Sequence, residues 1–492
     1  MGPGAIAWAL AALALAAAKP VQRCKRGEPC KQEITKHYWP RSRGHVGNYG
    51  NTEHAAPLNL SSALAWTWHH PDGRYKAVLL GGPNIDQHRN LYITTVSQVV
   101  KFDEEGRMLW AYHADLGAPF PDNVVLMGDM VYGNQVDGVV FALDQRTGKR
   151  RWHKKFGTHC GADTGYVEAH DGIVFTAVEG PAGGGNHRMI AVNGTDGDLI
   201  WTYAVPKVLW NFMPMFLDDG TFITMDVHGG VYKMDEYEGR LLWHTPPPAQ
   251  YRESFSDGYV SVNPGGTIAF ACADLQWGGP GTQGSLRAYN TSTGHKLWDL
   301  VLTHPCTTWV PSDGETVYAA HGPLPGPVGM SSLPQWTPFS VRMLLHGFSM
   351  WLGPWQRFLW GNPRLYTEVW GIEEKTGIVK WQYKDVPPWD YPACGGDEEG
   401  VIERSTFVPT RGQCMTAAWG SSTVDGNGWV WTPHMDGFVY GIKDVNGDGK
   451  IDPATEVSTF DMGGSASLHF GSAYAPGLMG LATCDTLFVF KW

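Results

Sequence analysis

Oxygen-bearing side chains recur near the C-terminus at the spacing of a calcium-binding loop. Asp444, Asn446 and Asp448 stand at positions 1, 3 and 5, and Gly449 stands at position 6. The remaining expected ligands are a backbone carbonyl and two carboxylates, from Lys450, Asp452 and Glu456. Glu456 comes one residue later than the usual last ligand. The spacing predicts a structural calcium site over residues 444–456, with a metal-free turn rich in Asp and Asn as the alternative.

The residues on both sides of this loop, 437–442 and 457–460, have the composition of strands. No pair of helices is therefore available to open when an ion binds, as happens in calcium sensors. We expect a calcium clip on a β-hairpin and no signalling role.

Carboxylates that could serve as a catalytic base are scattered near the ends of predicted strands. The candidates are Asp163, Glu168, Glu179, Asp226 and Asp274. A base must converge with other groups in one site, and nothing in the spacing of these five residues singles one out. The consecutive pair His69-His70 offers no metal site, because neighbouring strand residues point to opposite faces. The sequence therefore leaves the catalytic residues unassigned.

Two kinds of covalent modification can be predicted from the sequence: disulfide bonds between cysteines and glycosylation of asparagines in sequons. The disulfides that we favour join Cys24 with Cys30 and Cys394 with Cys414, whereas Cys272 lies in an apolar run and is expected to be a buried thiol. Three sequons for N-glycosylation begin at Asn59, Asn193 and Asn290. An even number of cysteines, 8 in all, suits an oxidising compartment.

The N-terminal residues 1–18 resemble a secretory signal peptide. The apolar run 6–18 ends in three alanines that suit cleavage, and it is too short to span a bilayer. No basic residue precedes the run, so an uncleaved leader or a buried segment is the alternative. We predict a protein that is secreted or lumenal, or periplasmic in a bacterium. The net charge of -11, without a basic cluster, disfavours nucleic-acid binding.

Glycine, proline and tryptophan indicate an all-β chain of many short strands. The 492 residues include 62 Gly, 33 Pro and 23 Trp, spread along the whole length. One pattern recurs: an alternating strand, an Asp or Asn turn, a glycine, and a tryptophan four residues later, as in Val140–Trp152. The tryptophans of the pattern, together with that of the first outer strand, are Trp66, Trp110, Trp152, Trp201, Trp243, Trp298 and Trp381. From Trp110 onward they are 42, 49, 42, 55 and 83 residues apart, which is typical of four-stranded propeller blades with variable loops.

Each part of the repeat has a physical role. The Asp or Asn side chain accepts hydrogen bonds from its own turn, and the glycine supplies the positive φ that the turn needs. The tryptophan begins an outer strand, where its ring fills the gap between twisted sheets and its indole N–H requires an acceptor. A β-sandwich or β-solenoid with unrelated turns is the alternative to a propeller.

The repeat resembles the tryptophan-docking, or PQQ, repeat of the quinoprotein alcohol dehydrogenase-like superfamily, over roughly residues 39–492. The resemblance implies an eight-bladed β-propeller, with seven blades as the alternative. Residues 63–68 look like an outer strand without its preceding strands, and residues 486–492 look like an inner strand without its outer partner. Their pairing would complete one blade and leave no open edge.

The predicted domains are a signal peptide (1–18), an N-terminal extension (19–60) and a propeller (61–492) with an insertion at 320–366. Residues 336–360 within this insertion are too apolar for an ordinary loop, yet they hold charged residues that argue against a membrane span. Two short helices over one face, a lid over a central pocket, and a contact surface for a partner or membrane remain as interpretations.

Two functions agree with the resemblance. The first is a binding or scaffolding propeller for a protein or glycan, with structural calcium. The second is a dehydrogenase in which PQQ and calcium oxidise an alcohol or sugar, with an Asp as base. The chain has no adjacent cysteine pair, which such dehydrogenases commonly place beside the quinone, and no Cys-x-x-Cys-His motif for a covalent haem. These absences favour the binding function.

Overall fold

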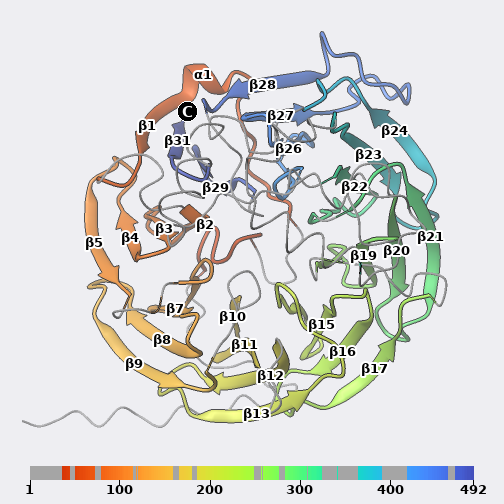
Figure 1. The fold of residues 1–492 in the computed structure, drawn as a ribbon. Helices are drawn as coiled ribbons and strands as arrows, with labels where there is room; N and C mark the ends of the chain where they lie inside the picture. The colour runs from red at the N-terminus through yellow and green to blue at the C-terminus, as the bar shows by residue number, and fades with distance from the viewer. Residues whose placement is uncertain are drawn as a thin grey trace, which may run out of the picture.

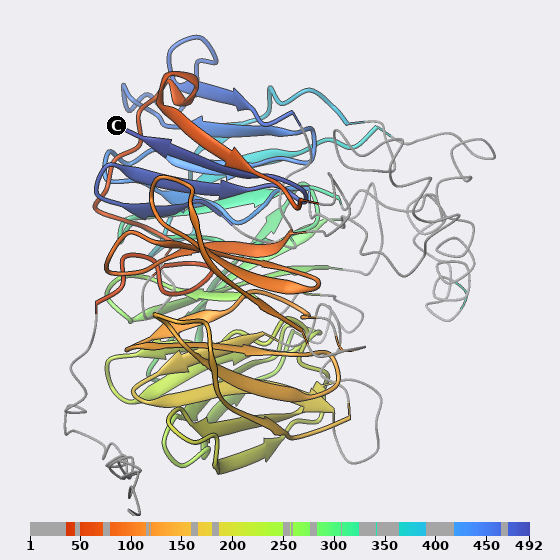
Figure 2. The same cartoon turned by 90° about the vertical axis from the view of Figure 1, so that its left-hand side faces the viewer.

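A computed structural model of the chain describes residues 36–44, 50–71, 79–114, 118, 120–158, 166–179, 186–248, 256, 259–275, 283–306, 308–323, 341, 364–389, 418–463 and 471–492. Within them, eight antiparallel sheets are arranged in a ring around one axis (Figure 1). Seen from the side, the sheets are stacked face to face around the ring (Figure 2). The predicted eight-bladed β-propeller is therefore confirmed, and the seven-bladed alternative is wrong.

Each blade runs from an inner strand near the axis to an outer strand at the rim. The strands of the first four blades are β2 (Leu79–Ile85), β3 (Leu91–Thr95), β4 (Gln98–Phe102) and β5 (Met108–His113); β6 (Val125–Met127), β7 (Met130–Asn134), β8 (Val139–Asp144) and β9 (Arg150–Lys155); β10 (Val167–His170), β11 (Ile173–Glu179), β12 (Asn186–Asn193) and β13 (Leu199–Ala204); and β14 (Met215–Leu217), β15 (Thr221–Met225), β16 (Val231–Asp235) and β17 (Leu241–Thr245).

The remaining blades follow the same order. Their strands are β18 (Val260–Val262), β19 (Ile268–Asp274), β20 (Gly284–Asn290) and β21 (Lys296–Leu302); β22 (Thr316–His321), β23 (Glu368–Glu373) and β24 (Val379–Tyr383); β25 (Thr423–Val424), β26 (Val430–Pro433), β27 (Phe438–Ile442) and β28 (Val457–Asp461); and β29 (Ala473–Ala475), β30 (Leu478–Ala482), β31 (Leu487–Lys491) and β1 (Leu64–Trp68). In the sixth blade, a bridge between Ser312 and Val317 takes the place of an inner strand.

The ring closes, as predicted, by pairing a strand from the N-terminal part of the chain with the last strand. The one-turn helix α1 (Leu60–Ala63) leads into β1, which pairs antiparallel with β31 and sets Trp66 opposite Val489. This pairing gives the eighth blade its outer strand. Without β1, the strand β31 would present an open edge at the rim, and the pairing covers that edge.

The repeat tryptophans lie on outer strands, and each of six reaches the turn of the following blade. Their indole N–H groups donate to backbone carbonyls 2.8–3.1 Å away. The pairs are Trp66 with Glu104, Trp110 with Gln145, Trp152 with Gly194, Trp201 with Glu236, Trp243 with Thr291, and Trp298 with Glu374. The tryptophan of one blade thus docks on the next, which joins neighbouring blades around the ring.

We expect Gly239→Ala to destabilise the protein clearly more than Gly128→Ala, by about 1–3 kcal/mol. Both glycines have positive φ, +66° and +58°, so both variants carry the backbone strain of a side chain there. A Cβ on Gly239 would meet the Trp201 ring, whereas a Cβ on Gly128 has no atom within 4 Å. Urea unfolding of both variants measures the difference. Equal losses would show that the turn glycine is needed for its conformation alone.

One cysteine prediction is wrong. Cys272, on β19, forms a disulfide with Cys306, and their Cα atoms are 5.5 Å apart. The apolar strand around Cys272 indicated burial, and Cys272 is 2% exposed, but the partner comes from the segment after β21, 34 residues later. Cys24, Cys30, Cys394 and Cys414 lie outside the described residues, so their pairing stays a prediction.

Candidate functional site at the propeller axis

The N-terminal segment 36–44 lies at the centre of the ring (Figure 1, red). We call it the axial arm. Its residues 39–43 contact the inner side of every blade, which only a segment on the axis can do. The contacted residues, in blade order, are Ile85, Leu126, Ala169, Phe216, Tyr259, Trp309, Ser421 and Tyr474.

Arg41 brings a charge into this buried centre. Its Nη1 is 3.0 Å from Oε2 of Glu168, and the two side chains are 3% and 2% exposed. Its Nη2 donates to the carbonyl of Ala169 at 2.7 Å, and the guanidinium lies 5.4 Å from the centre of the Phe216 ring. Burial raises the pKa of the Glu168 carboxyl, and the neighbouring Arg41 opposes that rise. Each of the two buried charged side chains therefore compensates the burial of the other.

Arg43 occupies the aromatic part of the axis. Its guanidinium carbon lies 4.2 Å from the centre of the Tyr259 ring and 4.7 Å from that of Trp309. Nε donates to the hydroxyl of Ser421 at 3.3 Å. A guanidinium held against two aromatic faces gains cation–π attraction where water is excluded. The arm is thus fastened at two levels, by an ion pair at Arg41 and by aromatic stacking at Arg43.

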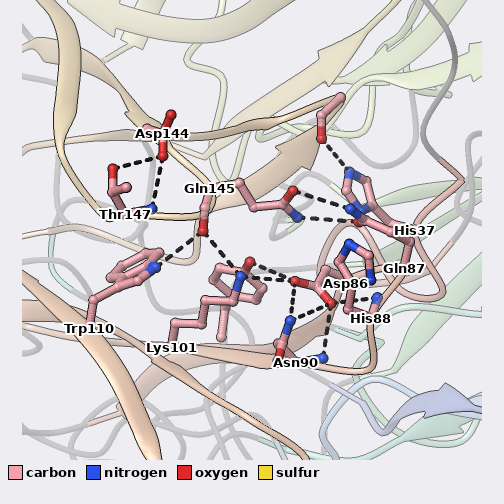
Figure 3. Close-up of polar contacts among 12 residues, drawn as sticks. His37, Asp86, Gln87, His88, Asn90, Lys101, Trp110, Asp144, Gln145 and Thr147 are labelled. Carbon is pink, nitrogen blue, oxygen red and sulfur yellow. Dashed lines mark hydrogen bonds and ion pairs between the residues drawn. The ribbon is translucent and has the colours of Figure 1, made fainter.

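The arm also lies next to a polar network between the first two blades (Figure 3). Asp86 accepts a hydrogen bond from the Tyr92 hydroxyl at 2.9 Å and pairs with Lys101 at 3.1 Å. Nζ of Lys101 also donates to the Gln145 carbonyl, the same oxygen that accepts from Trp110. His37 of the arm lies beside this network; it contacts the Gly128 carbonyl at 3.0 Å, and burial lowers its pKa.

Sequence reasoning assigned residues 19–60 to an extension and missed this site. The available signal was the grouping of His37, Arg41 and Arg43 with Tyr38 and Trp39 in residues 36–44. This composition does not say what the segment contacts, because its partners come from all eight blades.

The described axis does not fit a quinone cofactor held with calcium. Such a group needs a flat surface for stacking and a carboxylate for the ion. The aromatic faces of Tyr259 and Trp309 lie against Arg43, and the carboxylate of Glu168 is paired with Arg41. Among the described residues, these aromatic faces and this carboxylate are thus already engaged by the chain itself.

The other carboxylates considered as bases are engaged locally in separate blades. Glu179 accepts from the Thr158 hydroxyl at 2.7 Å, and Asp226 accepts from the Tyr232 hydroxyl at 2.9 Å. Asp274 accepts from the Cys306 amide at 2.9 Å, and burial raises its pKa well above the ordinary value. Asp163 lies outside the described residues.

The calcium-like loop connects β27 to β28, at the position where other blades have the docking turn. Asp444 accepts from the amides of Gly447 and Gly449, and Glu456 accepts from those of Val445, Asn446 and Asp452. Asn446 and Asp448 accept from the amides two residues further on. Ile451 is buried in the apolar cluster that contains Trp381, so the loop still packs against the preceding blade. These contacts hold the loop in shape and leave the calcium prediction untested.

The sequon asparagines lie at turns of the ring. Asn59 caps α1 and is exposed, while Asn193 and Asn290 are half-buried and accept hydrogen bonds within docking turns. Residues 1–18 and most of the insertion, including 342–360, lie outside the described residues, so the predictions made for them stay predictions. Among the residues that the structure describes, no helix combines the length and the apolar character needed to cross a membrane.

Comparison with protein families gives a match to one family model, described as outer membrane protein assembly factor BamB, over residues 59–163 and 136–312. Among curated proteins, the chain is 29% identical over 199 residues to outer membrane protein assembly factor BamB of Burkholderia pseudomallei, covering 40% of this chain and 47% of that protein. It is 31% identical over 121 residues to a 1-butanol dehydrogenase (quinone) of Thauera butanivorans, covering 22% and 17%. It is 37% identical over 82 residues to a quinoprotein ethanol dehydrogenase of Pseudomonas putida, covering 14% and 12%. The matches thus span less than half the length of these relatives.

Solved structures show the same fold at low sequence identity. BamB from Moraxella catarrhalis aligns with a TM-score of 0.55 and 13% identity, over 87% of this chain and 99% of that one. Quinohemoprotein alcohol dehydrogenase from Comamonas testosteroni aligns with a TM-score of 0.59 and 12% identity, over 92% and 80%. The propeller is thus shared with both a BamB and a dehydrogenase, and fold alone does not choose between their functions.

Proposed function

Because the chain belongs to the PQQ-repeat β-propeller family whose model is described as outer membrane protein assembly factor BamB, we propose that it is a binding or scaffolding propeller. The observation that carries this proposal is the axial arm, which fills the described centre of the ring with Arg41 and Arg43. When residues of the chain itself occupy the centre of a propeller, the loops on its faces are the surfaces that remain for binding a ligand. The ligand class is a protein or a glycan.

The proposal includes an exported location. The disulfide between Cys272 and Cys306 suits an oxidising compartment, because thiols in the cytosol are kept reduced. The signal peptide proposed at 1–18 and glycosylation at Asn59, Asn193 or Asn290 would agree with such a location.

The proposal also includes a structural calcium ion in loop 444–456. Asp444, Asp448 and Glu456 belong to one loop, and each accepts hydrogen bonds from backbone amides of that loop, which keeps three potential oxygen ligands within a short ordered segment. The ion would hold the docking position of the seventh blade, where this long loop replaces the ordinary short turn.

A thermal-unfolding titration of the purified chain tests the function. We expect calcium alone to raise the unfolding midpoint and pyrroloquinoline quinone to add nothing, with or without calcium. A ligand that binds only the folded state raises the stability by RT ln(1 + [L]/Kd), about 2.7 kcal/mol at a hundredfold excess over Kd. The calcium effect should disappear in Asp444→Ala and persist in Asp103→Ala, since Asp103 caps an ordinary docking turn in the first blade.

A calcium-dependent rise on adding the quinone would overturn the proposal. It would favour the alternative, a quinone-dependent dehydrogenase, and an oxidation assay with alcohols or sugars and an artificial electron acceptor would follow. If the quinone has no effect, cross-linking of the folded chain in extracts of its compartment identifies the partner, with the heat-unfolded chain as control.

A further inference from the structure

Three side chains with metal-binding atoms meet at the boundary between the third and fourth blades. His170 ends β10 and Asp171 follows it in the turn to β11, while Glu236 follows β16 in the next blade. One potential ligand atom from each lies within 4.8 Å of the other two. Nδ1 of His170 is 2.9 Å from Oε2 of Glu236, across 66 residues of sequence. The cluster lies outside the axial site and outside the calcium-like loop.

The buried carboxylate of Glu236 contacts the side chains of His170 and Tyr237, and these contacts do not satisfy both of its oxygens. Its side chain is 0% exposed, and its Oε1 is a buried oxygen without a hydrogen-bond partner among the described residues. A buried carboxylate oxygen that lacks a donor costs free energy. A cation bound at this place would remove that cost. His170, at 18% exposed, leaves the cluster a connection to solvent.

The neighbours of the three residues hold them in position. The Tyr237 hydroxyl donates to Oδ2 of Asp171 at 2.7 Å, and the His170 ring stacks on Phe216 with centres 4.7 Å apart. Asp171 adopts a left-handed backbone conformation, with φ of 49°. Metal ligands are commonly oriented by such outer contacts. Glu236 is fixed as well, because its backbone carbonyl accepts the Trp201 indole N–H at 2.8 Å.

We propose that His170, Asp171 and Glu236 bind a divalent transition-metal ion of the zinc class. Imidazole with carboxylates favours such ions, whereas calcium and magnesium favour sites made of oxygen alone. Two ligand atoms at about 2.1 Å from one ion stand about 3.0–3.4 Å apart, so the 2.9 Å contact needs only a small opening. The ion would replace the proton between Nδ1 and Oε2.

The proposed ion would link the third blade to the fourth, next to the hydrogen bond between the Trp201 indole and the Glu236 carbonyl. Three protein ligands are fewer than the four of a closed structural zinc site. A coordination position would therefore be left for water or for an external ligand. The proposed binding function does not require this site, and the site does not require that function.

Metal titration of the full chain tests the proposal. We expect isothermal titration with ZnCl₂ to show a stoichiometric site that is lost in Glu236→Gln and in His170→Gln. The matched control is His153→Gln, an exposed histidine of β9, which should bind zinc as the wild type does. Asp444→Ala should also leave zinc binding unchanged, and millimolar calcium should not compete. Tyr237→Phe, which removes an outer contact only, should weaken zinc binding about 10–100-fold.

Two results would overturn the proposal: the wild type binds no zinc in a stoichiometric ratio, or Glu236→Gln binds it with the wild-type affinity. Circular dichroism checks that each variant folds. If both ligand variants fail to fold, the wild type still decides through Co²⁺, whose visible absorption bands should appear at one equivalent and vanish on adding zinc. Absence of those bands would count against the site in the same way.

Discussion

Arg41→Met is expected to lower the free energy of unfolding by about 3–5 kcal/mol. The substitution keeps most of the apolar stem and removes the charge that faces Glu168. That carboxylate is 2% exposed and pairs with Arg41 at 3.0 Å, so in the variant it would stay buried without its ion-pair partner and with only the weaker influence of Arg43. Breaking a buried ion pair on one side costs more than removing both partners, because one charge is left in a medium of low dielectric constant.

The decrease in the free energy of unfolding caused by Arg41→Met should depend on pH. The pKa of Glu168 is raised above its ordinary 4.5 by burial, and the rise is limited first by Arg41 and then by Arg43. A carboxyl whose pKa is higher in the folded state stabilises the fold while protonated, and this stability is lost as pH rises through the folded pKa. Without Arg41 that pKa rises further. The difference between variant and wild type should therefore be small near pH 4 and grow toward neutral pH.

Urea unfolding at several pH values measures both effects. Arg107→Met is the control, because Arg107 also pairs with an aspartate but is 80% exposed, and its loss should cost less than about 1 kcal/mol. Glu168→Gln in the Arg41→Met background should recover part of the stability. A loss as small as that of the control, independent of pH, would mean that the arm does not hold the axis in solution.

Trp201→Ala should be comparably severe, with a loss of about 3–5 kcal/mol. The Trp201 side chain is 8% exposed, lies parallel to the Phe222 ring with centres 6.3 Å apart, and donates to the Glu236 carbonyl at 2.8 Å. The alanine variant loses this apolar area and leaves a cavity between two blades. It also leaves a buried carbonyl of the docking turn without that donor.

Chemical denaturation compares this variant with Trp492→Ala. Trp492 is 47% exposed beyond the end of β31, so its removal should change stability by less than about 1 kcal/mol. Similar losses in the two variants would contradict the view that docking between blades, rather than the mere number of tryptophans, stabilises the ring.

The sequence alone determined the blade. A turn residue, a glycine and a tryptophan at fixed offsets are local features, and a pattern of about 12 residues can specify them. Ring closure followed from the resemblance to the PQQ repeat, within which 63–68 and 486–492 each looked like a strand without its partner. Even the need for an acceptor at the indole N–H followed from its burial. The acceptor itself, in the next blade, is set by the stacking of neighbouring repeats.

Only the tertiary structure decided what meets across blades. Arg41 and Ala169 are 128 residues apart, and His170 and Glu236 are 66 apart, with no motif linking either pair. The same holds for Cys272 and Cys306, where burial was correctly predicted and pairing was not. Local spacing fixes the conformation of a hairpin, whereas these contacts depend on how the hairpins are rotated around a common axis. That rotation results from the packing of all eight sheets at once, so no single segment of the chain encodes it.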